Sequence, residues 1–241
     1  MYFWSILDKK RFGLKTARLN LNEEVVDVNN IIQSFITKKG QLFIVKCNSL
    51  NNEMIFQLQK KGFFLTDTML TFSRSSIIKS EDVSDLCAEI AYARPSDSSL
   101  LADLAQRSFA NYRGHYHHNP LLDNKLCDEV YTDWARRLCI DKSLADEVFL
   151  AMQNGKYVGF ASLKVDEKGI AKGGLLGVIP EYRGKGISRF LHIHRLLWCS
   201  NKNVKEIQVE ISVNNKMYIN LLIQMGFKLE YSNQVFHLNN F

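Results

Sequence analysis

Apolar and polar residues recur with two different periods along the chain, and these periods predict a mixture of helices and strands. Apolar residues at three- and four-residue spacings predict helices over residues 28–36, 53–61, 98–109 and 124–139, from residue 187, and after residue 215. Two-residue alternation and short apolar runs predict strands over residues 14–21, 42–47, 87–94, 148–152, 157–165, 175–179, 205–213 and 231–238, with one or two strands over 63–73. Such a mixture is typical of an α/β or α+β protein.

Local turn signals support this division. Asn154-Gly155 lies between two predicted strands, and this dipeptide favours the type I′ turn of a β-hairpin. Residues 166–169 end in Gly169 and predict the next turn. Three consecutive antiparallel strands are therefore expected between residues 148 and 179.

The chain contains one internal repeat. Residues 51–65 align without a gap with residues 215–229, and in both segments an asparagine precedes a helix that a Gly-Phe pair follows. A strand is predicted before and after each copy. We therefore predict a truncated α/β domain over residues 1–77, a polar linker over 78–84 and a complete domain over 85–241.

The composition favours a soluble protein that binds an anion. The 241-residue chain has a formal net charge of +6, which suits an anionic ligand, but its Lys and Arg pairs are dispersed rather than gathered into a nucleic-acid-binding stripe. No apolar run is long enough to cross a bilayer, and the N-terminus does not resemble a signal peptide. The five scattered cysteines include no CxxC pair, which indicates reduced thiols and a cytoplasmic location. The composition leaves open whether the chain forms a homodimer.

A glycine-flanked turn joins the predicted strand 175–179 to the helix from residue 187. Pro180 ends the strand, and Gly184 and Gly186 permit a tight backbone path into the helix. A helix N-terminus presents unpaired N–H groups and the positive end of the helix dipole, so it binds phosphates. Arg183 and Lys185 add positive charge, and the alternative is a basic surface turn.

This turn resembles motif A of the GNAT acetyltransferase superfamily, Gln/Arg-x-x-Gly-x-Gly/Ala, with Ser188 at the last position. The resemblance covers residues 85–241. It implies a GNAT fold with a mixed, mostly antiparallel central sheet, preceded by the smaller half-GNAT-like α/β domain. It also implies that acetyl-coenzyme A contacts Leu176, Gly177, Val178, Arg183, Gly184, Lys185, Gly186, Ile187, Ser188, Arg189 and Asn215.

The superfamily's capped helix carries a tyrosine that protonates the leaving sulfur, and this chain has Leu222 at that position. Tyr218 lies one turn earlier on the same helix face. Because a turn is about 5.4 Å long, we expect its hydroxyl to contribute less than tenfold to the rate. His117 and His118 are the expected base, since the pKa of histidine lies near neutrality.

The loop over residues 110–120 is polar and aromatic, and in the superfamily the corresponding loop commonly contacts the acceptor. The resemblance thus implies acceptor contacts from Tyr112, Arg113, His115 and Tyr116. No carboxylate or cysteine stands at ligand spacing from the histidines, so we predict no metal site. The alternative is that this loop packs on the surface without a role in catalysis.

A narrower resemblance concerns the acceptor. Phe109-Ala-Asn-Tyr-Arg113, Tyr131-Thr-Asp-Trp134 and Gly174-Leu-Leu176 resemble segments of the dTDP-4-amino-4,6-dideoxygalactose (dTDP-fucosamine) N-acetyltransferases. This resemblance implies N-acetylation of a nucleotide-linked amino-deoxy sugar. Two alternatives remain: an acetyltransferase of another small amine or of protein N-termini, and a coenzyme A-binding module without catalysis.

Overall fold

The computed structural model describes residues 2–21, 27–78 and 87–241, and within them all strands join one ten-stranded sheet. The N-terminal elements are β1 (Phe3–Ser5), α1 (Ile6–Phe12), β2 (Thr16–Leu21), α2 (Val28–Thr37), β3 (Leu42–Asn48), α3 (Asn52–Lys60) and β4 (Phe64–Ser75). The C-terminal elements are β5 (Glu89–Tyr92), α4 (Ser98–Phe109), α5 (Asn124–Leu138), β6 (Glu147–Gln153), β7 (Lys156–Val165), β8 (Ala171–Val178), α6 (Ile187–Asn201), β9 (Glu206–Ser212), α7 (Lys216–Gln224) and β10 (Lys228–Asn239).

The strand order is β1-β2-β3-β10-β4-β9-β8-β7-β6-β5. Only β2–β3 and β8–β9 pair in parallel among the described residues, and the other neighbours are antiparallel. The predicted mixed, mostly antiparallel sheet is therefore confirmed. Asn154 and Gly155 both have positive φ angles at the β6–β7 turn, as the type I′ prediction requires.

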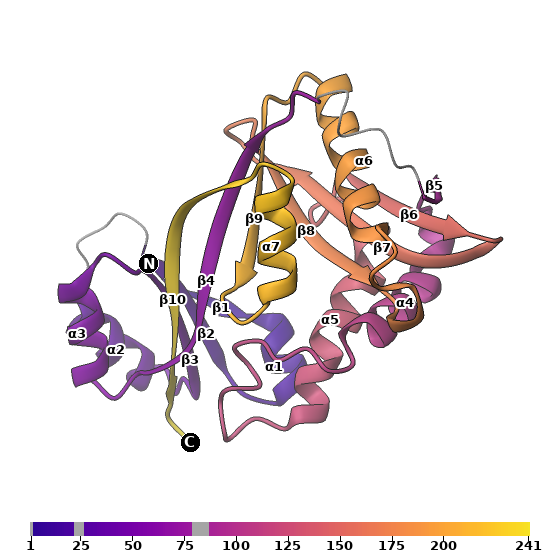
Figure 1. Ribbon diagram of the computed structural model, residues 1–241. Helices are drawn as coiled ribbons and strands as arrows, with labels where there is room; N and C mark the ends of the chain where they lie inside the picture. Colours follow the sequence, from indigo (N-terminus) through magenta and orange to yellow (C-terminus); the bar gives the residue numbers. More distant parts are fainter. Residues whose placement is uncertain (1, 22–26, 79–86) are drawn as a thin grey trace.

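The two copies of the internal repeat interleave in the sheet. β10 lies between β3 and β4, and β4 lies between β10 and β9, so each copy inserts its closing strand beside the other copy (Figure 1). The copies share their local geometry. Asn51 accepts a hydrogen bond from the Met54 N–H at 3.1 Å, and Asn215 accepts one from the Tyr218 N–H at 3.3 Å. Of the predicted linker 78–84, residues 79–84 lie outside the described residues.

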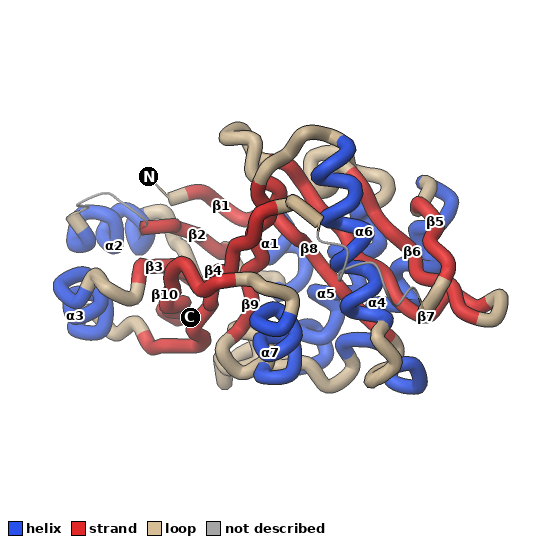
Figure 2. Tube along the Cα trace, turned by 45° about the horizontal axis from the view of Figure 1, so that its top comes forward, coloured by secondary structure: helices blue, strands red, loops and turns tan. Residues whose placement is uncertain are grey.

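Helices cover both faces of the sheet. A Cβ atom on Gly173 would meet Arg195 of α6, whereas one on Gly177 would meet Ser108 of α4, so α6 and α4 lie on opposite sides of β8. Figure 2 shows α6 over the C-terminal strands, α7 near β9, and α2 and α3 beside the N-terminal strands. The largest core cluster packs α4, α5, α6 and α7 on the C-terminal strands, and a second cluster packs α2 and α3 on β2 and β3. Among the described residues, none of the helices has the length and apolar character needed to span a membrane.

Candidate active site

β8 and β9 pair over only three residues before they diverge. Residues 171–173 pair in parallel with residues 207–209. Beyond this point β8 follows β7 as far as Val178, whereas β9 follows β4 as far as Ser212. The facing edges of the two strands are then open in the described sheet, and an extended ligand can hydrogen-bond to their backbone groups.

A β-bulge lies at the start of this opening. Ala161 pairs with Leu176 but Leu163 pairs with Gly173, so β8 contains one residue more than β7 over this stretch. The bulge explains why Gly173 and Gly177, four residues apart, face opposite sides of the sheet. It turns the second half of β8 away from β9.

Arg195 of α6 holds the bulge. Its Nη2 donates to the carbonyl oxygens of Ser162 at 2.7 Å, Gly174 at 3.1 Å and Leu175 at 2.9 Å. The side chain is completely buried. Gly173 leaves room for it, because a Cβ atom there would lie 3.2 Å from Nη1.

The turn after β8 leads into the N-terminus of α6. Pro180–Tyr182 form one turn of 3₁₀-helix. Gly184 and Gly186 have φ angles of +72° and +80°, and Gly186 is the N-cap of α6 with no side-chain capping bond. The first N–H groups of α6 are therefore available to an anion. Ile187 is buried, whereas Ser188 and Arg189 are partly exposed.

Arg183 supports this turn through backbone contacts. Its Nε donates to the Val178 carbonyl at 3.1 Å, and its Nη2 donates to the Ser108 carbonyl at 2.7 Å. The side chain thus ties the end of β8 to the end of α4. Lys185 extends over the ring of Tyr182, 4.7 Å from its centroid.

A cavity of about 860 Å³ lies beside the β8–β9 opening. Its walls come from β8, β9, α5, α7 and the 110–120 loop, and also from α1, β2, β3 and β4 of the N-terminal segment. Residues predicted from the sequence that line it are Leu176, Asn215, Tyr218, Tyr112, His115 and Tyr116. The residue pattern of the N-terminal segment gives no sign of its contribution to this cavity.

Tyr218 lies in the cavity wall, and its hydroxyl is 2.7 Å from Nε2 of His192 on α6. Burial raises the pKa of Tyr218, while the charge of the neighbouring Arg195 guanidinium lowers it. Burial also lowers the pKa of His192 well below its usual value, so this ring is neutral. Leu222, at the position of the superfamily's tyrosine, is completely buried in the main core. Of positions 218 and 222 on α7, position 218 thus places a phenol in the cavity wall.

The structure does not bring His117 and His118 to the cavity. The Nδ1 of His117 accepts from the Gly114 N–H at 3.2 Å, and its Nε2 lies 2.9 Å from Asp128. Nδ1 of His118 donates to the Thr66 carbonyl at 2.6 Å. Neither histidine is among the residues that line the cavity, so the geometry does not support the expected base. Arg113 also lies outside the lining and contacts Asn124.

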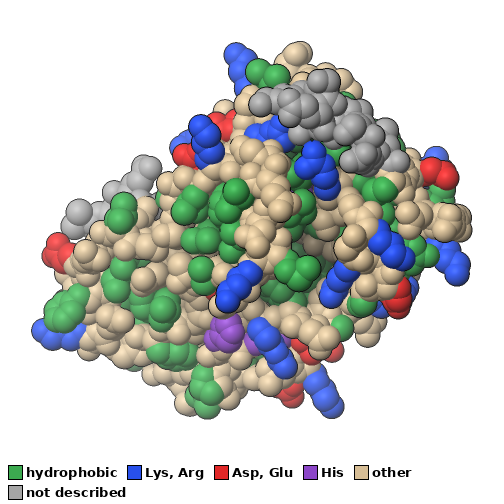
Figure 3. All heavy atoms as spheres, viewed as in Figure 1, with side chains coloured by type: hydrophobic (Ala, Val, Ile, Leu, Met, Phe, Trp, Pro, Cys, Tyr) green, Lys and Arg blue, Asp and Glu red, His purple; other side chains and the backbone are tan. Residues whose placement is uncertain are grey.

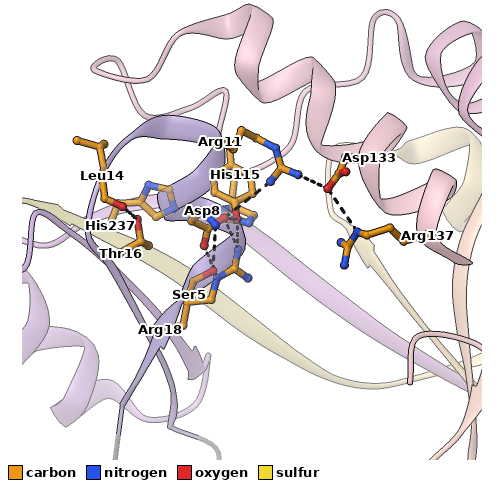
Figure 4. Close-up of polar contacts among 11 residues, drawn as sticks. Ser5, Asp8, Arg11, Leu14, Thr16, Arg18, His115, Asp133, Arg137 and His237 are labelled. Atoms are coloured by element: carbon orange, nitrogen blue, oxygen red, sulfur yellow. Dashed lines mark hydrogen bonds and ion pairs between the residues drawn. The ribbon is translucent and has the colours of Figure 1, made fainter. Parts of the chain in front are cut away.

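A buried carboxylate from α1 organises the opposite wall of the cavity (Figure 4). Arg18 donates to Asp8 through Nε at 2.7 Å and through Nη2 at 3.0 Å, and the Tyr116 hydroxyl donates to Asp8 at 2.7 Å. Arg11 bridges α1 to α5 through Asp133 at 2.8 Å. These contacts fasten the N-terminal segment to the acetyltransferase-like part. A single Asp in a short charged segment gave no sequence signal.

Glu210 is the cavity carboxylate nearest in sequence to the strand opening, because it directly follows Val209, the last residue of β9 that pairs with β8. Lys46 of β3 forms an ion pair with it across the sheet. The sequence analysis missed this pair, since the two residues are far apart in the chain. Glu210 is an exposed carboxylate that can accept a proton.

The cavity wall contains more basic than acidic side chains, but each basic side chain forms an ion pair with a carboxylate. Six cationic side chains line it, against the carboxylates Asp8 and Glu210. The six are Arg11, Arg18, Lys46, Arg137, Lys164 and Lys172. On the molecular face in Figure 3, Lys and Arg side chains are instead scattered singly among neutral ones. Within the described ranges, no three His, Cys, Asp or Glu side chains form a group that could hold a metal ion.

Comparisons with known proteins agree with this geometry. Residues 105–227 match the sequence model of the acetyltransferase (GNAT) family. No curated protein sequence matches the chain. Among solved structures, a functionally unknown conserved protein from Staphylococcus epidermidis ATCC 12228 is similar with a TM-score of 0.69 and 11% identity, over 100% of this chain and 91% of that one.

Two further solved structures share the fold. A tandem GNAT protein from the clavulanic acid biosynthesis pathway has a TM-score of 0.62 and 12% identity, over 94% of this chain and 76% of its own. The glucosamine N-acetyltransferase region of a fungal multi-domain GH3 beta-N-acetylglucosaminidase has a TM-score of 0.62 and 14% identity, over 98% of this chain and 31% of its own. At these identities the likeness concerns the fold alone. Because the family match spans just over half of the sequence, this chain belongs to the GNAT acetyltransferase family.

Proposed function

We propose that this chain is an acetyl-coenzyme A-dependent N-acetyltransferase of a nucleotide-linked amino-deoxy sugar. The observation that carries the proposal is the β8–β9 opening, which runs from a large cavity to an uncapped helix N-terminus. Backbone groups of residues 176–178 would bind the pantetheine arm and the thioester. N–H groups of residues 184–189 would bind the pyrophosphate.

Tyr218 is the proposed acid of the reaction. When the amine attacks the thioester carbonyl and the C–S bond breaks, the sulfur takes the proton of the Tyr218 hydroxyl. The Arg195 charge beside this hydroxyl stabilises the phenolate that remains. The phenolate then recovers a proton from solvent, and the solvent in turn takes up the proton that the amine has lost.

Glu210 is the proposed acceptor of the proton that the amine loses. It lies in the cavity wall next to the point where β8 and β9 separate, and Lys46 fixes its side chain. Proton transfer to it runs directly or through one water molecule. Backbone N–H groups of β8 would polarise the thioester carbonyl.

Three observations support a nucleotide-linked sugar as the acceptor. The cavity volume falls within the range of about 300–1,000 Å³ that is typical of small-molecule sites. Tyr112, Tyr131 and Trp134 offer ring faces to a base or a sugar. One structural neighbour is described as a glucosamine N-acetyltransferase region, which fits an amino sugar.

Mass spectrometry after incubation with acetyl-coenzyme A tests the proposal. The panel comprises dTDP-4-amino-4,6-dideoxyhexoses, glucosamine, polyamines and a peptide with a free N-terminus. We expect the dTDP-amino sugars to gain one acetyl group at the highest rate. Preferential acetylation of another amine or of the peptide would support the acetyltransferase activity but refute the sugar as its substrate. Coenzyme A binding without any acetylated product would indicate the non-catalytic module.

A further inference from the structure

Three side chains form a hydrogen-bonded row that leads from the interior to the cavity. Asn119 Nδ2 lies 3.0 Å from Nδ1 of His237 on β10, and Nε2 of His237 lies 2.9 Å from Nδ1 of His115. Asn119 and His237 are buried, whereas His115 lines the cavity. Figure 4 shows His115 and His237 next to the Asp8–Arg18 pair. Imidazole nitrogens donate or accept according to their tautomer, so the row determines where each proton lies.

The orientation of the Asn119 amide determines the direction of the first hydrogen bond in the row. The Leu121 N–H donates to Asn119 Oδ1 at 3.1 Å, so the other end of the amide is the Nδ2 donor. The Asn239 amide pairs reciprocally with the Asn119 amide in this orientation, at 2.9 and 3.0 Å. One Asn119 Nδ2 hydrogen points to Asn239 and the other to Nδ1 of His237.

The tautomers of both imidazoles follow from this amide. Nδ1 of His237 accepts a hydrogen bond, so the single proton of the neutral ring is on Nε2 and is donated to His115. Nδ1 of His115 therefore accepts as well, and its own proton is on Nε2. A second proton on either ring would place two N–H groups face to face.

The surrounding charges keep both rings neutral. Burial is the main cause that lowers the pKa of His115 well below its usual value, and the charges of Arg18 and Lys46 act in the same direction. Burial and Arg18 lower the pKa of His237 to about 3, while Asp8 opposes them. The electrostatic influence of His117 also lowers the pKa of His115. The His115 ring therefore stays neutral near neutral pH.

We infer that His115 donates its Nε2–H to an uncharged oxygen of the acceptor, a hydroxyl or a carbonyl, and does not act as a base. Among the described residues, Nε2 of His115 has no hydrogen-bond partner, and this ring lines the cavity. Asn119 and His237 are positioning residues that act through His115. This inference rests on the proposed function and deepens it, because it requires an acceptor with an oxygen near its amino group.

Nitrogen chemical shifts of the imidazole rings test the tautomers in the full chain without any ligand. We expect His115 and His237 to be neutral and protonated on Nε2 across about pH 5 to 8, the range in which an ordinary histidine titrates. Replacement of His237 by Leu should release His115, which would then titrate or exchange tautomers. A His115 that carries its proton on Nδ1, or that titrates in the wild type, overturns the inference whatever the acceptor is.

Turnover of two primary amines tests the contact with substrate. Glucosamine and cyclohexylamine have rings of the same size, but only glucosamine has hydroxyl groups. His115→Phe should lower kcat/KM for glucosamine roughly tenfold, since it removes one hydrogen bond, and should leave cyclohexylamine unchanged. His115→Gln, which retains a donor, should restore most of the loss, and His194→Gln on α6 is the matched control.

An equal loss for both amines would refute the contact. If neither amine nor any dTDP-amino sugar is acetylated, the proposed function fails, and the imidazole shifts still decide the tautomers independently. A kcat/KM profile in which His115→Phe removes a pKa near neutrality would also overturn the inference, because a neutral donor contributes no titration.

Discussion

At the scale of single residues, Tyr218 and Leu222 show how one helical turn separates a buried position from a cavity position. Leu222 is completely buried in the core, while Tyr218 presents its hydroxyl to His192 at the cavity wall. A tyrosine at position 222 would have to enter a packed core, which is costly. The phenol that α7 contributes to the cavity wall is therefore Tyr218, one helical turn before position 222.

Replacing Tyr218 by Phe is expected to lower kcat roughly 10- to 100-fold, up to the low end of the range for acid catalysis. This effect is larger than the one expected from the sequence, because Tyr218 lies in the cavity wall. The affinity for coenzyme A should not change, because the ring remains in the wall. Steady-state kinetics and calorimetry measure the two quantities. The double variant His117→Gln, His118→Gln should keep most of the wild-type activity, since neither side chain lines the cavity. If the double histidine variant is inactive and Tyr218→Phe is active, the histidines and not Tyr218 take part in the proton transfer.

Arg183 is expected to act through geometry as well as charge. Arg183→Glu should weaken coenzyme A binding by about 1–3 kcal/mol, the range for hydrogen bonds to charged groups. Arg183→Lys should also weaken it, because a single ammonium group cannot hold the Val178 and Ser108 carbonyls as the guanidinium does. Calorimetric titration measures both. Full affinity in the lysine variant would mean that only the charge matters.

At the scale of elements, the divergence of β8 from β9 depends on a bulge that α6 stabilises. Arg195 satisfies three carbonyls that the bulge removes from the regular β7–β8 ladder. A buried carbonyl without a donor costs free energy. The strand opening and the helix that follows it are thus one structural unit.

Arg195→Met should therefore lower the free energy of unfolding by roughly 2–4 kcal/mol, because buried acceptors lose their donor. Urea unfolding followed by circular dichroism measures this change. Arg189→Met, on the same helix but partly exposed, is the control and should change stability by no more than about 0.5 kcal/mol. Similar small effects in both variants would show that the bulge needs no support from α6.

At the scale of the whole molecule, the interleaved strands make the N-terminal segment part of the acetyltransferase sheet. β10 pairs with β3 and β4 on its two sides, and β4 pairs with β9. Neither copy of the repeat can keep its sheet when the other unfolds. The Arg11–Asp133 contact adds a second link between the N-terminal segment and α5.

We expect one cooperative unfolding transition for the full chain. Two variants that each keep one tryptophan, Trp4 in β1 or Trp198 in α6, report on the N-terminal and C-terminal parts of the sheet. Their fluorescence midpoints in urea should coincide, as two-state behaviour requires. An earlier transition at Trp4 would show that the N-terminal segment unfolds by itself.

The sequence by itself determined the features that depend on neighbouring residues. The Asn154-Gly155 hairpin, the asparagine caps of α3 and α7 and the left-handed glycines before α6 all occur as predicted. These signals are short-range, because a turn or a cap needs only a few residues with the right backbone preferences. The short strand β1 and helix α1 were missed, since three and seven residues give too little periodicity.

The tertiary structure alone decided which distant segments meet. Tyr116 contacts Asp8 across 108 residues, and His115 contacts His237 across 122. It also decided the exchange of β4 and β10, and it gave Tyr218 rather than His117 a place in the cavity. The physical reason is that strand order and cavity walls minimise the energy of the whole sheet and its core. Local preferences leave several arrangements equally acceptable, and only packing distinguishes them.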